Sequence, residues 1–325
     1  MKSVVEDIKK GSFKPVYLFY GEEAYLKQQY KNRLKNAVLP EGDTINLSIY
    51  SGKGIDVKEM IAQADTMPFF AEHRLLLIED SGFFKNANQQ LAEYIPSIPE
   101  ETIMLFVESE VDKRGKLYKA VSKKGSVVEF TAQNEQTLTR WILGILKTEG
   151  KMITSGAMKQ FLEKTGTDME RIRQELEKLI CYCMEKESIT EEDVAVICSE
   201  QTENKIFDMI NAMAEKKQKK AMELYYDLLA LKEPPMRILY LITRQFNLLM
   251  QVKELSEEGY SAKTISERLK MAGFIVRNCL RQAEYFSLKT LKEALQDSVR
   301  MEEAVKTGRM NDVMSVELLL VKYSS

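Results

Sequence analysis

The sequence has little of the side-chain chemistry on which most active sites depend. Its 325 residues include one histidine, His73, and four cysteines. A Ser-His-Asp or Cys-His nucleophile would have to use His73, and a histidine-rich metal site is excluded. No cysteine pair has C-x-x-C spacing, so no zinc site is indicated, and we expect small, reduced core residues. The four cysteines are Cys181, Cys183, Cys198 and Cys279.

Long apolar runs and an excess of one charge are also missing. No run approaches the ~18 apolar residues of a membrane span, and the opening "MKSVVEDIKKGSFKP" lacks the apolar core of a signal peptide. We therefore expect a cytoplasmic protein with no membrane contact. The net charge of −2 gives no overall attraction to nucleic acid, so any DNA contact must come from a local patch.

The first part of the chain alternates apolar strands with helices. Near-continuous apolar strands of this kind predict a parallel sheet covered on both faces. Asp56 is placed to cap one of the helices. The predicted strands are 15–20, 45–50, 74–80, 102–109 and 126–131, and the predicted helices are 23–37, 57–66, 89–94 and 115–125.

The remainder of the chain, from Thr137, is almost entirely helical in pattern. A helix that begins at Pro234-Pro235 is apolar over much of its circumference, which is typical of the centre of a bundle. We expect a multidomain protein: an α/β domain over 1–140, a small helical lid over 141–203 and a larger helical bundle over 204–325. The apolar positions of the central helix are Ile238, Leu239, Leu241, Ile242, Phe246, Leu249 and Val252.

An α/β sheet followed by a helical lid is the outline of an AAA+ ATPase, but the nucleotide site is not there. A phosphate-binding loop needs G-x-x-x-x-G-K-[ST] after the first strand. Here the turn reads "GEEAYLKQQ", and Glu22 and Glu23 would repel a phosphate. Glu79 and Asp80 resemble a magnesium-binding strand end, although a solvated strand terminus is the better interpretation. We therefore predict an ATPase shape without ATPase chemistry or any cofactor.

Two basic stretches are weak candidates for nucleic-acid contact. They are "DKRGKLYKAVSKKG", 112–125, and "EKKQKKA", 215–221. Lysine and arginine that neutralise phosphates add salt-dependent affinity, yet a solvated basic face explains either stretch more simply.

The segment "TMPFFAEHRLLLIED", 66–80, joins a predicted helix to a predicted strand. Pro68 is expected to end the helix and to present Phe69 and Phe70. The two rings either pack the helix onto the sheet or bind another protein. The pattern alone leaves both alternatives open.

Several ordered motifs resemble one known family. They are "PVYLFYGEEAYLKQQ", "DTMPFFAEHRLLLIED", "MLFVESEVDKRGKLYKAV", "QELEKL" and "KTGR". In this order they are similar to the delta subunit of the bacterial DNA polymerase III clamp loader, across nearly the whole chain. The resemblance implies a three-domain AAA+ architecture with a collar domain at the C-terminus, and a subunit that does not hydrolyse ATP.

The resemblance also implies partners and site residues. It predicts that Phe69 and Phe70, with Met67 and Pro68 alongside, bind the beta sliding clamp and help to open it. The family often has a Leu-Phe pair there, so Phe-Phe is a conservative departure. The collar would join the gamma/tau ATPase subunits and delta-prime around primer-template DNA. Within "KTGR", Lys306 and Arg309 are weak candidates for DNA proximity.

Two other classes of function stay open at this point. One is a divergent AAA+ ATPase with an unusual loop, which tight ATP binding at the "GEEAYLK" turn would favour. The other is a stand-alone DNA-binding protein, which a steeply salt-dependent DNA affinity would favour.

Overall fold

The computed structural model describes residues 1–86, 88–198 and 202–324. The chain divides into two compact units, Met1–Gln133 and Asn134–Ser325, which we describe one at a time. Within the described residues, no helix is long and apolar enough to cross a membrane.

The first unit is built on a five-stranded sheet in the order β2-β3-β4-β1-β5, in which all neighbours are parallel. Its central strands are buried on both faces because nearly every residue in them is apolar. On β1, Val16 and Leu18 face one core and Tyr17 and Phe19 face the other. The strands are β1 Val16–Tyr20, β2 Leu47–Ser51, β3 Arg74–Glu79, β4 Thr102–Glu108 and β5 Ser126–Glu129.

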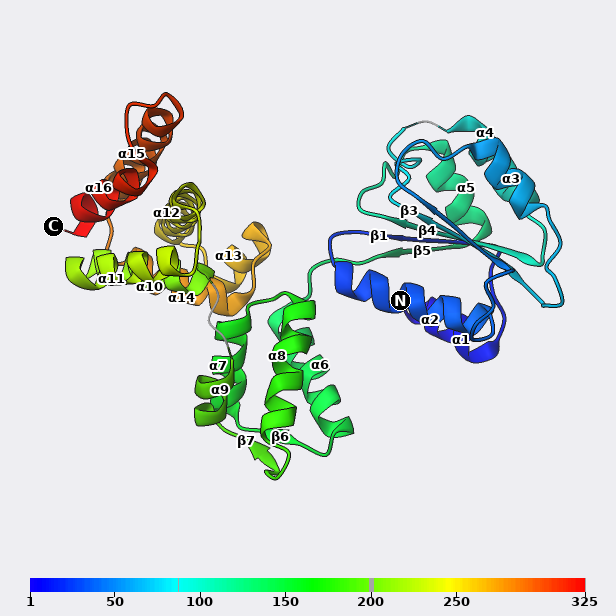
Figure 1. Ribbon diagram of the computed structural model, residues 1–325, viewed down its shortest axis with the longest axis horizontal. Coiled ribbons are helices and arrows are strands. Elements are labelled where there is room, and N and C mark those ends of the chain that lie inside the picture. The colour runs from blue at the N-terminus through cyan, green and yellow to red at the C-terminus, as the bar shows by residue number, and fades with distance from the viewer. Residues whose placement is uncertain (87, 199–201, 325) are drawn as a thin grey trace. The chain divides into compact units, whose positions relative to one another are not determined.

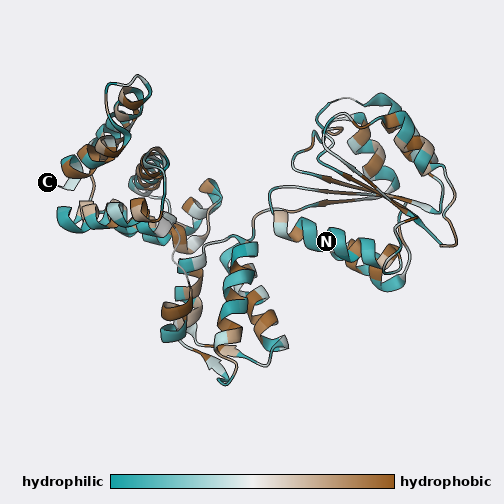
Figure 2. Cartoon of the chain, viewed as in Figure 1, coloured by the Kyte–Doolittle hydropathy of each residue, from teal (hydrophilic) through white to brown (hydrophobic). Residues whose placement is uncertain are grey.

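Helices cover both faces of this sheet (Figure 1). The helices α1 and α2 pack on one face, and α3, α4 and α5 pack on the other. Figure 2 shows brown, apolar strands between helices that carry teal, polar residues. The elements are α1 Lys2–Lys10, α2 Ala24–Val38, α3 Val57–Ala64, α4 Gln89–Tyr94, the 3-10 turn η1 Ile95–Ser97 and α5 Lys116–Lys124.

The five predicted strands and the four predicted helices of this unit are confirmed, whereas α1 was not predicted. One helix end differs by more than one residue from its predicted position. The helix α3 ends at Ala64, two residues before the predicted end at Thr66. Pro68 explains the difference, because a proline ring clashes with the carbonyl four residues earlier and its nitrogen cannot donate to it.

The second unit begins with a small group of helices and one short strand pair. Thr190 and Asp193 form a capping box at the start of α9. The parallel pair β6–β7 was not predicted, since two-residue strands are too short to show a pattern. The elements are α6 Glu135–Thr148, β6 Met152–Ile153, α7 Ser155–Thr165, α8 Met169–Tyr182, β7 Ser188–Ile189 and α9 Glu191–Ile197.

The rest of the second unit is a bundle around α12. Pro235 is the first residue of α12, and all seven apolar positions expected at the centre of the bundle are buried. Ser287 caps α15, since its side chain accepts from the N–H of Thr290. The helices are α10 Thr202–Ala214, α11 Gln218–Ala230, α12 Pro235–Glu257, α13 Ala262–Leu269, α14 Gly273–Ala283, α15 Leu288–Lys306 and α16 Asp312–Ser324.

The expected combination of an AAA+-like α/β domain with all-α regions is therefore the fold of this protein. The expected boundary at residue 140 lies inside α6, and the expected boundary at 203/204 lies inside α10. The division into three domains, with a lid and a collar, stays a prediction.

Candidate functional site

The segment between α3 and β3 presents large apolar side chains to solvent. Phe70 is 95% exposed, Met67 is 78% exposed and Phe69 is 56% exposed, while Pro68 is half-buried. The ring of Phe70 therefore does not pack onto the sheet of its own unit, which was one of the two alternatives for this residue. An exposed apolar cluster of this kind is typical of a protein-binding site.

The edge of the sheet adds to this apolar surface. Strand β2 is an outer strand of the sheet, and Ile49 on it is 59% exposed. Ile45, just before the strand, is 63% exposed. A protein partner that covered the aromatic pair could use this edge as well.

The backbone of Phe70 is held in an unusual conformation. Its φ is +50°, in the left-handed region that bulky residues seldom adopt. The rings of Phe69 and Phe70 lie edge to face, with centroids 4.6 Å apart and planes at 81°. A left-handed aromatic residue persists only where its surroundings hold it, and such residues cluster at functional sites.

The side chain of Asn46 holds the backbone of Phe69, the residue before Phe70. The backbone N–H of Phe69 donates to Asn46 Oδ1 at 2.7 Å, and Asn46 Nδ2 donates to the carbonyl of Phe69 at 3.0 Å. The side chain of Asn46 therefore pairs with Phe69 in the way that a neighbouring strand would. Asn46 was not among the predicted site residues.

Arg74, at the start of β3, is hydrogen-bonded to the same segment. It is 6% exposed, and its guanidinium donates to the Met67 carbonyl at 3.4 Å and to Gln63 at 3.3 Å. Two buried nitrogens in this region, Arg74 Nε and His73 Nδ1, have no hydrogen-bond partner among the described residues. Arg74 was also not predicted, since its apolar neighbours in β3 gave no sign of a buried cation.

The turn after β1, where an ATPase would hold phosphate, is filled by the protein itself. Gly21 has φ +116°, and a Cβ there would lie 2.3 Å from the carbonyl oxygen of Phe130. The carboxylate of Glu23 accepts from the N–H of Tyr25 and caps α2, and that of Glu22 accepts from the N–H of Ala132. The Glu23 carboxylate therefore binds a backbone N–H group at the N-terminus of α2, where a phosphate would otherwise be held.

The strand ends beside this turn are also occupied by side chains of the protein. Lys31 of α2 pairs with Glu79 at 2.7 Å, so Glu79 is not the purely solvated strand terminus that the sequence suggested. Lys27 donates to the carbonyl of Glu108 at 3.1 Å. Burial raises the pKa of the Glu108 carboxyl, although the Ser81 hydroxyl and the N–H groups of Ser81 and Gly82 donate to it.

Many of the predicted basic candidates are paired. Lys306 binds Glu302 at 2.5 Å and Arg309 binds Glu303 at 3.0 Å, both at the C-terminal end of α15. A phosphate would have to compete with these glutamates. Four residues of the basic stretches are also paired: Lys113 with Glu129, Arg114 with Asp112, Lys217 with Glu215 and Lys219 with Glu223.

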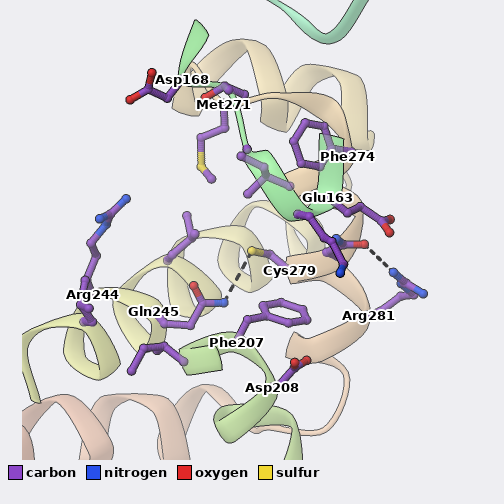
Figure 3. A pocket seen from close by; sticks show the side chains of 18 of the residues that line it. Glu163, Asp168, Phe207, Asp208, Arg244, Gln245, Met271, Phe274, Cys279 and Arg281 are labelled. Carbon is purple, nitrogen blue, oxygen red and sulfur yellow. Dashed lines mark hydrogen bonds between the residues drawn. The ribbon is translucent and has the colours of Figure 1, made fainter. Parts of the chain in front are cut away.

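The second unit contains a cavity of about 750 Å³. It is lined by the α7–α8 turn, which includes Asp168, and by α10, α12 and α14 (Figure 3). Lys164, on its wall, donates to the carbonyls of Ala195 and Cys198. Gln245 donates to the sulfur of Cys279 at 3.8 Å.

The buried thiols offer no activated nucleophile. Burial raises the pKa of Cys279 to about 11 and that of Cys198 to about 12, so both stay protonated near neutral pH. Cys183 is buried as well, but Cys181 is exposed on α8, so the prediction that all four are core residues is wrong for Cys181. None of the four is in a disulfide. Among the described residues, no cluster of histidine, cysteine and carboxylate side chains could hold a metal ion.

A parallel sheet with helices on both faces, followed by all-helical regions, is the fold that the resemblance to a clamp-loader subunit implied. Two family matches agree. Residues 17–131 match the family described as "DNA polymerase III, delta subunit", and residues 203–323 match its C-terminal domain. The chain belongs to the DNA polymerase III delta-subunit family.

Individual relatives support the same assignment. The chain is 30% identical to the DNA polymerase III subunit delta of Bacillus subtilis over 98% of this chain and 95% of that protein. It is 21% identical to the probable subunit delta of Aquifex aeolicus, over 75% and 72% of the two chains. The solved Bacillus subtilis DNA clamp loader delta protein superposes with a TM-score of 0.69, over 99% of both chains. The function of this chain is accordingly that of a delta subunit within a clamp loader.

Proposed function

We propose that this chain binds the beta sliding clamp through Phe69 and Phe70, with Met67 and Pro68 at the margin, and that it helps to open the clamp. The observation that carries the proposal is the exposure of Phe70, which is 95% for a large aromatic side chain. Phe70 would enter a pocket of the clamp, and Phe69 would support it from the side. Buried aromatic side chains of this kind are typical hot spots of protein interfaces.

Opening of the clamp follows from differential binding. The turn that would hold ATP is filled, so we infer that the isolated chain draws no energy from nucleotide hydrolysis. A protein without such an energy source favours an open ring only by binding the open form more tightly than the closed form. The ATPase subunits would then control when Phe69 and Phe70 reach the clamp.

The C-terminal bundle would join the chain to the rest of the loader. Met314, Leu318 and Val321 lie four and three residues apart on α16, and they are 51%, 43% and 37% exposed. This spacing places them on one face of the helix. We propose this face as a contact with the gamma/tau ATPase subunits or delta-prime in a replisome-associated, cytoplasmic complex that encloses primer-template DNA.

The collar proposal has a test that is independent of the clamp. Met314→Glu with Leu318→Glu would place two carboxylates on the α16 face. We expect these changes to prevent co-purification with the ATPase subunits and delta-prime while the affinity for the clamp stays unchanged. Normal assembly of the doubly substituted chain would show that this face is not the contact.

The main proposal is tested by a pull-down of the full chain with its cognate sliding clamp. The Phe69→Ala, Phe70→Ala double variant should lose the clamp while its circular dichroism spectrum and thermal unfolding stay those of the native chain. The matched control is Phe83→Ala, an aromatic truncation within the same unit but outside the segment, which should retain the clamp. Retention of the clamp by the double variant would overturn the proposal.

A further inference from the structure

We propose that Asn46 is a positioning residue for the clamp contact, because its side-chain amide fixes the backbone that presents Phe70. The inference rests on the proposed function and adds to it a buried residue that would act on the contact residues without touching the clamp. Asn46 is 2% exposed, so it is not itself a contact residue.

The orientation of the Asn46 amide is fixed by its partners. Nδ2 donates to two groups that can only accept, the Phe69 carbonyl at 3.0 Å and Asp43 Oδ2 at 2.7 Å. Oδ1 is thereby turned toward the N–H of Phe69, which donates to it at 2.7 Å. Each polar group of the Asn46 side chain has a partner of the right kind.

The backbone of Asn46 is fixed as well. Its N–H donates to Asp43 Oδ1 at 3.0 Å, and its carbonyl accepts from the N–H of Leu75 at 2.8 Å in β3. Asn46 therefore connects the rigid sheet to a segment that has no regular structure of its own. The two hydrogen bonds to Phe69 reach across 23 positions of the chain.

The segment needs such a connection because Phe70 is in the left-handed region, at φ +50°. This conformation is unfavourable for a residue with a Cβ and a large ring. The attachment through Arg74 is longer, since Arg74 reaches the Met67 carbonyl at 3.4 Å while Arg74 Nε and His73 Nδ1 lack hydrogen-bond partners among the described residues. The pair of bonds from Asn46 is the attachment nearest to Phe70.

A segment that is held in its binding conformation before it meets a partner loses less conformational freedom on binding. Removing the amide of Asn46 would leave Phe70 present but free to leave the left-handed conformation. Clamp affinity would then fall even though no contact residue had changed.

The test is a calorimetric titration of the full chain with the cognate clamp. Asn46→Ala removes both hydrogen bonds to Phe69, and we expect about tenfold weaker binding. Asn46→Asp should weaken binding at least as much, because a carboxylate cannot donate to the Phe69 carbonyl and stands beside Asp43. Asn36→Ala, at an exposed position of α2, is the matched control and should bind normally.

A double-mutant cycle separates positioning from a general loss of stability. If Asn46 acts through Phe70, Asn46→Ala should weaken clamp binding in the native chain but not in the Phe70→Ala chain. A merely structural role would weaken both chains equally. In addition, the one-bond Cα–Hα coupling of Phe70, which depends on the sign of φ, should change in Asn46→Ala and not in Asn36→Ala.

The outcomes are distinguishable. If Phe70→Ala weakens clamp binding but neither Asn46 variant does, the positioning role of Asn46 is overturned and the proposed function stands. Equal effects of Asn46→Ala in both backgrounds would also overturn the positioning role. If Phe70→Ala leaves clamp binding unchanged, the proposed function fails and this inference fails with it.

Discussion

The rings of Phe69 and Phe70 lie edge to face, with the two centroids 4.6 Å apart, while the N–H and the carbonyl of Phe69 are both hydrogen-bonded to the side chain of Asn46. The two neighbours therefore differ in role. Phe69 is attached to the sheet and is 56% exposed, and Phe70 stands away from it at 95% exposed. Under the proposed function, a partner would meet Phe70 first and Phe69 second.

Gly21 is predicted to be intolerant of any side chain. Gly21→Ala would bring a Cβ to 2.3 Å from the Phe130 carbonyl oxygen at a φ of +116°. We expect a destabilisation of about 3 kcal/mol or more, seen as faster hydrogen exchange of the β1 and β5 amides.

Gly11 provides the control for this prediction. Its φ is also positive, at +63°, but nothing lies within 4 Å of an added Cβ. Gly11→Ala should therefore lower the free energy of unfolding by only about 1 kcal/mol, because the positive φ is its only unfavourable feature. Equal exchange rates in the two variants would show that the turn after β1 is not closed in the way described.

Asp193 makes the α9 region sensitive to acid. A hydrogen bond from Lys186 and one from the Thr190 N–H lower the pKa of its carboxyl from 3.8 to about 2. Because the folded state binds this proton more weakly than the unfolded state, the stabilisation is complete above about pH 4. It is lost as the pH falls through the folded pKa toward 2.

The measurement is amide exchange of α9 as a function of pH, corrected for the intrinsic pH dependence of exchange. Protection in the native chain should fall between about pH 4 and pH 2. In Asp193→Asn, which cannot ionise at this position, the fall in protection should be absent. Protection of α9 in this variant should also be lower than in the native chain at neutral pH. An identical pH profile in both chains would contradict the assignment.

Asp297 is predicted to hold the last helix of the bundle. It lies on α15, is 7% exposed, and binds Lys322 and the hydroxyl of Tyr323 on α16. Asp297→Ala would leave the buried Tyr323 hydroxyl unpaired, and we expect a loss of about 2–4 kcal/mol in urea unfolding of the bundle. Gln296→Ala, at an exposed neighbouring position, should change the unfolding free energy by less than about 0.5 kcal/mol.

The sequence was most informative where a residue's role depends on near neighbours. The three central strands of the sheet, β1, β3 and β4, were predictable because a strand buried on both faces must be apolar almost throughout, as "VYLFY" and "LLLI" are. The central helix α12 was predictable because its apolar positions recur around most of its circumference. The absence of a phosphate loop could be read directly, since that motif is local.

The attachment of the aromatic pair could not be predicted in the same way. Asn46 acts on Phe69 across 23 positions, and an asparagine before a strand more commonly indicates a turn. The left-handed conformation of Phe70 likewise depends on that distant attachment. The one local signal was the Asp43-x-x-Asn46 spacing, in which the side chain of Asp43 fixes Asn46.

Affinity of single-residue variants for the cognate sliding clamp, measured by isothermal titration calorimetry, tests the central claim most directly. Burial of a Phe ring contributes about 1.5–3 kcal/mol, so Phe70→Ala should raise Kd roughly 10- to 150-fold. Phe69→Ala should raise Kd by a smaller factor, because Phe69 is only 56% exposed and so has less surface left to bury. A Phe70→Ala chain that is folded and binds the clamp with native affinity would contradict the account.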